Sequence, residues 1–504
     1  MCPHGLRTVA DAATRLDTML AHGSSLLAPA LLGARTIVSS CASASAAPAL
    51  ALAKPGLLSS IFGLGGSRID VPLSEKLPAV TEPPRTSTPA TRPAVQTSSL
   101  SSGVKVATIE SVSPLSSLVL FVEGGSSAET SSTAGASKLL EVAAFKATAN
   151  RSTFRLTREL EKIGATSYCR AGRDHIAFGV DAVRLNQREA LEMLADAVVN
   201  ARYPYWEVRD SLDALKEQLA LQLKNPLTTV NEVLHRAAFD GGLGNSLVVD
   251  PSLVDGFSNE TLKEYLASIM TPSRIVLAGV GVDHAEILQL AGPLLSVPAS
   301  APAAVPASKY VGGAMNVIAP SSALTYVALG FEAVGGASTP KSAAAAAVTK
   351  ALLDEARPTL PRARKEHAVF RSLTPFAHLY KGSGLVGLTG SSSPAQAGAL
   401  VDALTAKVQS AAKGISEAQL AQAKALALGE LKAATATTAG LVAAVGSSVL
   451  ATGKFSGLEV AAAIQAMTAA EASSYVAALI KTPPTVVSYG NLSSLPRSIA
   501  GRFA

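Results

Sequence analysis

The residues that come nearest to a catalytic motif lie between Gly135 and Thr148, where the chain reads Gly-Ala-Ser-Lys-Leu-Leu-Glu-Val-Ala-Ala-Phe-Lys-Ala-Thr. In the zinc-binding pattern His-x-x-Glu-His, two imidazoles four residues apart face one metal ion, and the glutamate between them activates a metal-bound water. Here Glu141 occupies the glutamate position, while Lys138 and Val142 stand where the histidines would be. An ammonium group and a hydrocarbon are not zinc ligands. We therefore expect neither a metal site nor a catalytic residue in this segment.

No other segment supplies the missing chemistry. The seven histidines have no partner four residues away: His4, His22, His175, His235, His284, His367 and His378. Asp174-His175 and Asp283-His284 could be read as pairs of base and orienter, but adjacent strand residues point to opposite faces. Gly279-Val-Gly281 lacks the third glycine of a dinucleotide-binding turn. We expect no bound cofactor.

The elements around Glu141 can be read from the hydrophobic pattern. An apolar run from Leu118 to Gly125 predicts a strand, which a polar loop connects to the helix that carries Glu141. Alternation predicts a second strand from His175 to Val183. Apolar residues at helical spacing predict helices over 187–200 and 208–223.

The chain also contains an internal repeat. Two landmarks recur at an offset of 211 residues. The first is a Gly-Gly pair that closes a strand, at Gly124-Gly125 and again at Gly335-Gly336. The second is a Thr-Pro pair that precedes a strand: Thr271-Pro272 leads to a strand that reaches Gly279, and Thr482-Pro483 leads to one that reaches Gly490. The repeat predicts two homologous domains, over 103–295 and 314–504, joined by a linker over 296–313 that is rich in Pro and small residues. Strands interspersed with packed helices indicate an α+β fold, in which each domain packs a mostly antiparallel sheet against helices.

The composition excludes several classes of protein. Hydrophobic residues make up 48% of the chain and charged ones 16%, which favours extensive burial or large interfaces. The net charge of +6 is modest, and no basic stripe suggests nucleic-acid binding. Three cysteines, Cys2, Cys41 and Cys169, cannot form a disulfide framework. Cys169 lies in an alternating stretch and is interpreted as a strand residue.

The N-terminal region has the composition of a targeting segment. Residues 1–69 contain five basic and two acidic residues among many Ala, Ser and Leu, and Leu6, Val9, Ala13 and Leu16 recur at helical spacing. This pattern is typical of an amphipathic organelle transit peptide, such as a mitochondrial one, and an ordinary N-terminal helix is the alternative. Residues 70–102, rich in Pro, Ser and Thr, are interpreted as an extension.

The strand, loop, helix and Phe145-Lys-Ala-Thr148 sequence resembles the strand, loop, helix and Phe-Lys-Gly-Thr sequence of the mitochondrial processing peptidases and the core subunits of respiratory complex III. The resemblance continues through Asn225 to Gly281, with Leu234-His-Arg-Ala-Ala-Phe239, and reaches Gly490-Asn-Leu492. It implies the duplicated inverted-zinc-peptidase (M16) fold. It also implies that the family's third metal ligand, a glutamate, falls near Lys216 to Leu219 of this chain. Glu217 is the only carboxylate there, and counting residues back from Leu234 places Gln218 at the ligand position.

The resemblance further implies a role. The alpha processing subunits have a glycine-rich loop that handles presequences, and the corresponding segment here, Leu353 to His367, contains no glycine. This favours a noncatalytic core 2 type of subunit, at the matrix side of the inner membrane. Its implied partners are core 1, cytochrome b, cytochrome c1, the Rieske protein and the small subunits of complex III. The alternative is an alpha-type partner of a processing peptidase. The sequence shows no ligand set for heme, quinone or an iron–sulfur cluster.

Overall fold

The computed structural model describes residues 94–111, 113–249, 251–297, 308–354 and 370–496. These all lie in one compact unit, Ala90–Ala504. The predicted transit peptide, most of the extension, most of the linker and most of the glycine-free segment lie outside the described residues.

The first half is built on a six-stranded sheet. The strand order is β1-β2-β7-β3-β5-β4, and the β2–β7 pair is parallel while the other pairs are antiparallel. The strands are β1 Val95–Ser99, β2 Lys105–Ile109, β3 Leu115–Glu123, β4 Thr166–Ala171, β5 His175–Val183 and β7 Ile275–Val280. The strand predicted from His175 to Val183 is confirmed with the same bounds.

The second half repeats this sheet with one strand fewer. Its order is β12-β14-β10-β15-β9, and only the β9–β15 pair is parallel. The strands are β9 Gly313–Ile318, β10 Thr325–Glu332, β12 Ser372–Leu379, β14 Gly384–Ser392 and β15 Thr485–Gly490. Because the order and the directions match the first sheet from β2 to β4, the duplicated α+β fold is confirmed.

Glycine is required at the turn that follows the central strand of each sheet. Gly125 and Gly336 both have positive φ, 76° and 46°. A Cβ atom would lie 2.3 Å from the Gly172 carbonyl oxygen at Gly125 and 2.1 Å from the Tyr380 carbonyl oxygen at Gly336. The two turns therefore have the same geometry, as the repeat predicts.

The second landmark needs a correction. Gly490 has its structural equivalent in Gly281 and not in Gly279. Gly281 and Gly490 both have positive φ, and a Cβ atom would lie 2.6 Å from the carbonyl oxygen of Leu115 at Gly281 and 2.6 Å from that of Leu324 at Gly490. Gly279 lies inside β7, paired with Leu118. Strands β7 and β15, and with them their pairing partners β3 and β10, are therefore related by 209 residues and not by 211.

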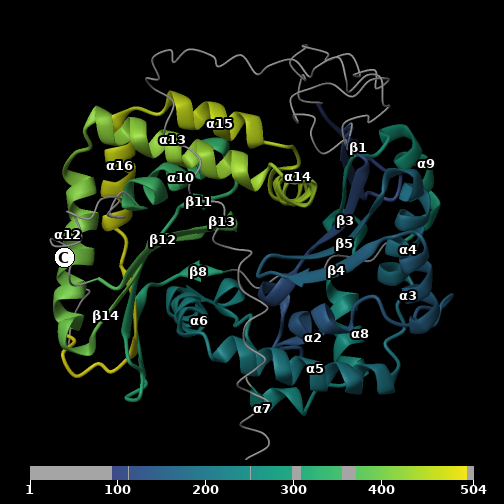
Figure 1. The fold of residues 1–504 in the computed structure, drawn as a ribbon, viewed down its shortest axis with the longest axis horizontal. Coiled ribbons are helices and arrows are strands. Elements are labelled where there is room, and N and C mark those ends of the chain that lie inside the picture. Colours follow the sequence, from purple (N-terminus) through teal and green to yellow (C-terminus); the bar gives the residue numbers. More distant parts are fainter. Residues whose placement is uncertain (1–93, 112, 250, 298–307, 355–369, 497–504) are drawn as a thin grey trace, which may run out of the picture. The chain divides into compact units, whose positions relative to one another are not determined.

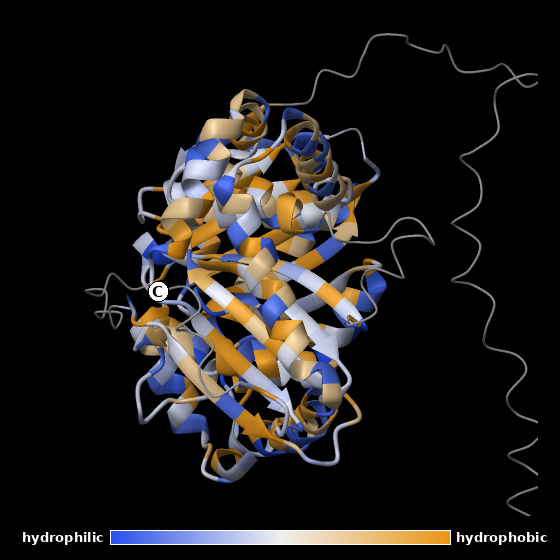
Figure 2. Ribbon diagram, turned by 90° about the vertical axis from the view of Figure 1, so that its left-hand side faces the viewer, coloured by the Kyte–Doolittle hydropathy of each residue, from blue (hydrophilic) through white to orange (hydrophobic). Residues whose placement is uncertain are grey.

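Helices cover the sheets. In the first half these are α2 Ala136–Ala143, α3 Thr153–Lys162, α4 Gln187–Val199, α5 Tyr205–Leu223, α7 Pro251–Val254, α8 Asn259–Ile269 and α9 His284–Leu294. In the second half they are α10 Pro340–Asp354, α12 Ala397–Lys413, α13 Glu417–Ala434, α15 Gly457–Ala466 and α16 Ala469–Ile480. Hydrophobic residues run along the strands that these helices cover (Figure 2).

Two further helices cross between the halves. Helix α6, Pro226–Ala238, belongs to the first half but packs on β10, β14 and β15 of the second sheet through Val230, Leu234 and Ala238. Helix α14, Thr438–Thr452, belongs to the second half but packs on β3 and β7 of the first sheet through Val442, Val445 and Val449. Figure 1 shows α14 beside the strands of the first half and α6 beside those of the second. The halves therefore share their cores.

Within the described residues, no single helix has both the length and the hydropathy to cross a membrane. Only the pair α13 and α14, bent by 105°, passes by length and composition when taken together.

Candidate functional site

Helix α2, which carries Lys138 and Glu141, begins at a buried polar cap. Gly135 precedes the helix with φ of 91°. The carboxylate of Glu129 accepts hydrogen bonds from Gly135 N (2.7 Å) and Ser137 N (2.9 Å), and so satisfies the N–H groups of the cap residue and of one residue in the first turn. Burial raises the pKa of Glu129 to about 7, although these hydrogen bonds oppose the shift. The cap fixes where α2 begins and thus which residues face inward.

Lys138 and Glu141 form an ion pair on α2. Lys138 Nζ lies 2.9 Å from Glu141 Oε1, and the lysine side chain is 8% exposed. The second oxygen of Glu141 accepts a hydrogen bond from Ala171 N, at the end of β4, at 2.9 Å. Val142 packs against the core of the first half. Both carboxylate oxygens of Glu141 therefore have partners.

The residues expected near the third ligand position lie on α5 but point away. Lys216, Glu217 and Gln218 are exposed, and Lys216 pairs with Asp255 at 2.7 Å. One turn further on, Gln222 borders a cavity of about 400 Å³ together with Lys138. Gln222 lies one helical turn after Gln218, so of these α5 residues it is the one on the side of Lys138.

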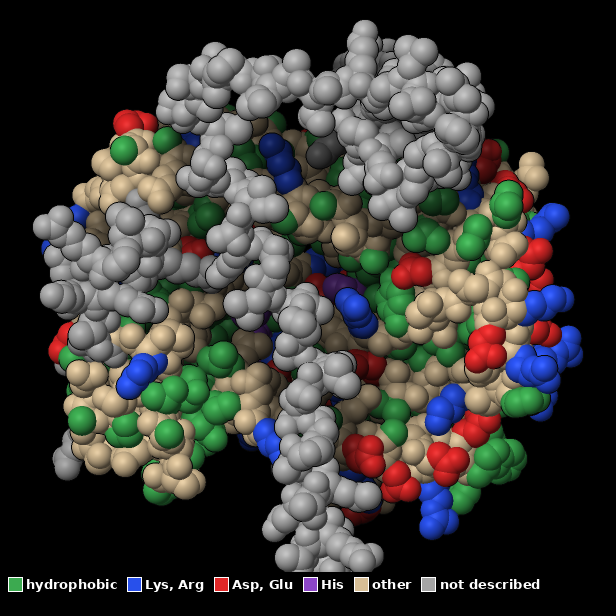
Figure 3. Space-filling model, in the orientation of Figure 1, with side chains coloured by type: hydrophobic (Ala, Val, Ile, Leu, Met, Phe, Trp, Pro, Cys, Tyr) green, Lys and Arg blue, Asp and Glu red, His purple; other side chains and the backbone are tan. Residues whose placement is uncertain are grey.

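A larger cavity, of about 540 Å³, lies between the two halves. It is lined by Arg173, Glu232 and His175 from the first half and by His378 and Tyr380 from the second. Figure 3 shows a hollow there, with basic, acidic and histidine side chains inside. Arg173 bridges two elements, because it pairs with Glu232 of α6 at 2.7 Å and donates to the carbonyl oxygen of Asn245 at 2.5 Å.

His235 of α6 is fully buried beside this cavity. Its Nδ1 lies 2.8 Å from the carbonyl oxygen of Asn231, which can only accept, so Nδ1 carries the proton. Its Nε2 therefore accepts from the Tyr380 hydroxyl, also at 2.8 Å. Burial, with the charge of Arg173 second, lowers the pKa of His235 well below its usual value, and it lowers the pKa of His378 to about 4. Both imidazoles are neutral at physiological pH.

The interpretation of Asp174-His175 needs a correction. The carboxylate of Asp174 lies 2.7 Å from Nδ1 of His175. The two residues do not point to opposite faces, because β5 begins only at His175 and Asp174 belongs to the turn before it. Asp283, by contrast, caps α9 by accepting from Glu286 N at 3.0 Å, while His284 contacts Ser98 and Thr108.

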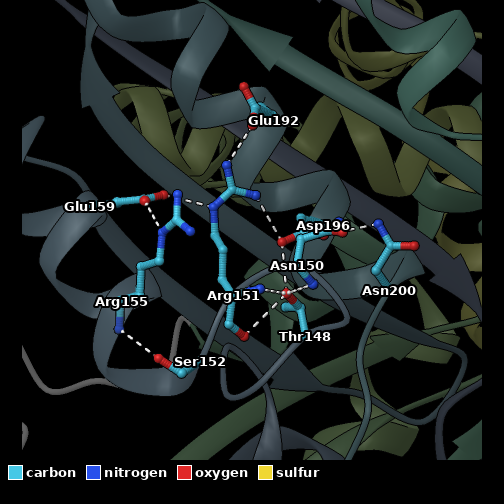
Figure 4. Close-up of polar contacts among 9 residues, drawn as sticks. All are labelled: Thr148, Asn150, Arg151, Ser152, Arg155, Glu159, Glu192, Asp196 and Asn200. Atoms are coloured by element: carbon cyan, nitrogen blue, oxygen red, sulfur yellow. Dashed lines mark hydrogen bonds and ion pairs between the residues drawn. The ribbon is translucent and has the colours of Figure 1, made fainter.

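Another charged cluster lies outside the cavities (Figure 4). Arg151 pairs with Glu159 at 2.7 Å, with Glu192 at 2.5 Å and with Asp196 at 2.9 Å, and Asp196 also accepts from Thr148 and Asn150. These contacts tie the loop after α2 to helices α3 and α4. The cluster is structural, because its carboxylates are occupied by Arg151 and by loop donors.

Neither the thiol nor the acidic groups form a reactive or metal-binding set. Cys169 lies in β4, as expected, and burial raises the pKa of its thiol, so the thiolate is not populated. Among the residues that the structure describes, no group of three or more His, Cys, Asp or Glu side chains is placed to hold a metal ion.

Comparisons with known proteins place this geometry in a family. Residues 105–251 match the family model for insulinase (peptidase family M16), and residues 256–427 match the model for the peptidase M16 inactive domain. The chain belongs to the M16 peptidase family.

Particular relatives divide into two kinds. The alpha subunit of the mitochondrial-processing peptidase of Solanum tuberosum is 32% identical over 88% of this chain and 90% of its own length. The mitochondrial cytochrome b-c1 complex subunit 2 of Mus musculus is 29% identical over 71% of this chain and 80% of its own length. A chain in the structure of complex III2 from Candida albicans with Inz-5 bound has the same fold, with a TM-score of 0.71 at 18% identity, over 82% of this chain and all of its own.

Proposed function

We propose that the chain is a noncatalytic M16 subunit of the mitochondrial cytochrome b-c1 complex, of the core 2 type, with a structural and assembly role at the matrix side of the inner membrane. The relatives named subunit 2 of that complex support the assignment. The proposed partners are a core 1 subunit and, through the assembly, cytochrome b, cytochrome c1 and the Rieske protein.

The observation that carries the noncatalytic part is the ion pair of Lys138 and Glu141. Zinc would have to displace an ammonium group that is already 2.9 Å from the glutamate, and that glutamate is also bound to Ala171 N. Val142 offers only hydrocarbon, and Gln222, the α5 residue that borders the same cavity, offers a neutral amide in place of a carboxylate. The residues present do not fit a zinc ion, so we derive no hydrolytic step.

Zinc binding tests this part directly. After chelation and dialysis against zinc, we expect the wild-type chain to retain less than stoichiometric metal by elemental analysis. The double variant Lys138→His/Val142→His restores two imidazoles four residues apart and should retain more zinc than the wild type. Stoichiometric zinc in the wild type contradicts the noncatalytic proposal, and no gain in the double variant contradicts the assignment of the two positions.

The assembly role is tested in native membranes. We expect the tagged full-length chain, extracted in mild detergent, to comigrate in stoichiometric amount with cytochrome b, cytochrome c1 and a core 1 homologue in native mass spectrometry. Recovery only as a pair with a catalytic peptidase subunit contradicts the core 2 role.

A second candidate is an alpha-type partner of a processing peptidase. The match to the potato alpha subunit favours it, since it covers more of the chain at slightly higher identity than the match to subunit 2. The glycine-free segment over 353–367 opposes it. This candidate would be supported if a purified catalytic partner cleaved presequences only in the presence of this chain. A subunit with both roles would comigrate with complex III and also stimulate cleavage.

A further inference from the structure

Strands β2 and β9 occupy equivalent places in the two sheets but have different neighbours. Each runs parallel to the closing strand of its half, β7 for β2 and β15 for β9. On its other side β2 pairs with β1, which runs antiparallel to it from Val95 to Ser99. Among the described residues no strand pairs with the outer side of β9.

Burial follows this difference. Four of the five residues of β2 are buried, from Val106 to Ile109. Five of the six residues of β9 are exposed, and the side chains include Met315 (37% exposed) and Ile318 (74% exposed). Helix α6 packs against part of β9. The exposure of β9 therefore does not mean that its sheet lacks a covering helix; it reflects the position of β9 at the edge of the sheet.

The unpaired backbone groups of β9 can be identified. Gly313 N donates to the Pro484 carbonyl oxygen at 3.4 Å, and Ala319 N donates to that of Gly490 at 2.9 Å. Backbone groups alternate in direction along a strand, so the odd-numbered residues face β15. The N–H and C=O groups of Ala314, Asn316 and Ile318 point to the open edge.

The chain just before β9 is held elsewhere. In the first half a tight turn, with Gly103 N bonded to Leu100 O at 2.9 Å, folds β1 back onto β2. In the second half the residues before β9 form β8, Lys309–Tyr310, which pairs with β6, Phe239–Asp240. Val311 N also donates to the Ala238 carbonyl oxygen at 2.8 Å. These described residues therefore cannot repeat the β1–β2 hairpin.

The edge also lacks the usual protection. Exposed edge strands commonly carry Lys, Pro or a bulge that prevents pairing with another chain. The β9 sequence, Gly-Ala-Met-Asn-Val-Ile, contains neither charge nor proline, and its pairing with β15 is regular.

We propose that the outer edge of β9 receives an extended segment of a partner polypeptide, which adds an antiparallel sixth strand where β1 lies in the first sheet. Strand addition of this kind uses main-chain hydrogen bonds for affinity. The β1 sequence, Val-Gln-Thr-Ser-Ser, indicates an uncharged segment of about five residues. Two exposed lysines lie in this region: Lys309, which precedes β9 in the sequence, and Lys481, which lies near Pro483. Their positive charge favours an acidic residue where the incoming strand ends.

The choice of a partner polypeptide rests on the proposed function, that of a subunit in a larger assembly. The first measurement is hydrogen exchange resolved to single amides, on the chain alone and in its native assembly. We expect the amides of Ala314, Asn316 and Ile318 to exchange at least about tenfold more slowly in the assembly. The amides of Met315 and Val317, which face β15, serve as internal controls that are protected in both samples.

Each alternative gives a different result. Free exchange of the outward amides in an intact assembly overturns the strand addition but leaves the proposed function standing, whereas failure to recover any assembly contradicts the proposed function itself. Protection in the monomeric chain alone shows that another part of this chain covers the edge. Protection that rises with concentration of the chain alone shows a second copy. The last two results also overturn the proposal.

A variant pair sharpens the test. Asn316→Pro removes an N–H that β15 does not use, which an edge strand tolerates, while Asn316→Ala keeps it. In the assembly we expect Asn316→Pro to abolish the protection of Ala314 and Ile318 and Asn316→Ala to retain it. Retained protection of Met315 and Val317 verifies that the variant is folded. Equal protection of the outward amides in both variants contradicts the proposal.

Discussion

Helices α6 and α14 hold equivalent places in the two halves, and each covers the sheet of the other half, but different interactions fix them. Polar contacts anchor α6: Glu232 pairs with Arg173 at 2.7 Å, and His235 is bonded to Tyr380 at 2.8 Å. Close packing anchors α14, where Gly446 lies directly against the ring of Phe121. The comparison teaches that a duplicated fold can preserve a helix position while the forces that hold the helix change.

The same divergence separates the two helices that follow the glycine turns. In the first half α2 carries a buried ion pair, Lys138 with Glu141. In the second half α10 presents Ala344, Val348 and Leu352 to a cluster of apolar side chains. The first half thus has an ion pair within this helix, and the equivalent helix of the second half packs its inner face through apolar side chains.

The largest effect is expected from loss of the polar anchor of α6. Arg173 is 4% exposed and its partner Glu232 is 12% exposed. Removing one member of a buried ion pair costs about 3–5 kcal/mol, because the other charge stays buried. We expect Arg173→Ala to lower the free energy of unfolding by this amount in chemical denaturation. The matched variant Arg155→Ala, whose side chain is 64% exposed, should cost about 1 kcal/mol or less. Equal losses would show that α6 does not depend on Arg173.

The packing anchor of α14 should come next. A Cβ atom at Gly446 would lie 2.0 Å from a carbon of the Phe121 ring. Overpacking of this kind costs about 1–3 kcal/mol, and we expect Gly446→Ala to reach the upper end of that range. Gly429 in α13 has no atom within 4 Å of the equivalent position. Gly429→Ala should stabilise by about 0.5–1 kcal/mol, because alanine favours the helix. A loss in both variants would contradict the packing argument.

The polar side of the comparison also predicts a pH dependence. Burial lowers the pKa of His378 to about 4 in the folded state, below about 6.5 in the unfolded chain. As the pH falls below about 6.5 the unfolded chain takes up the proton first, so the contribution of His378 to stability is lost toward acid pH. Between pH values of roughly 7.5 and 5 the wild type should lose about 2 kcal/mol more than His378→Asn.

The comparison of the wild type with His378→Asn removes the contribution of other titrating groups. The raised pKa of Glu129 acts with the opposite sign, because the folded state takes up that proton first, but Glu129 is present in both proteins and cancels. Parallel pH profiles of unfolding free energy in the two proteins would contradict a neutral, half-buried His378.

Sequence alone predicted the features that local chemistry dictates. Gly125 and Gly336 marked the repeat because only glycine fits their turns, and alternation gave the strand from His175 to Val183. The exchange of α6 and α14 could not be predicted, because an apolar helix face carries no information about which sheet it covers. The Asp174–His175 contact was missed because Asp174 was treated as a strand residue, whereas it lies in the turn before β5.

The smallest expected effect is one in which the two helices should behave alike. Asn225 caps α6 by accepting from Leu227 N at 3.1 Å, and Thr437 caps α14 by accepting from Gly440 N at 3.0 Å. Loss of such a cap costs about 1 kcal/mol, so Asn225→Ala and Thr437→Ala should lower the unfolding free energy about equally. Ser410→Ala, at an exposed position inside α12, should change it little. If only one cap mattered, the other helix would owe its first turn to contacts with the opposite sheet, and the asymmetry between α6 and α14 would extend to their starting points.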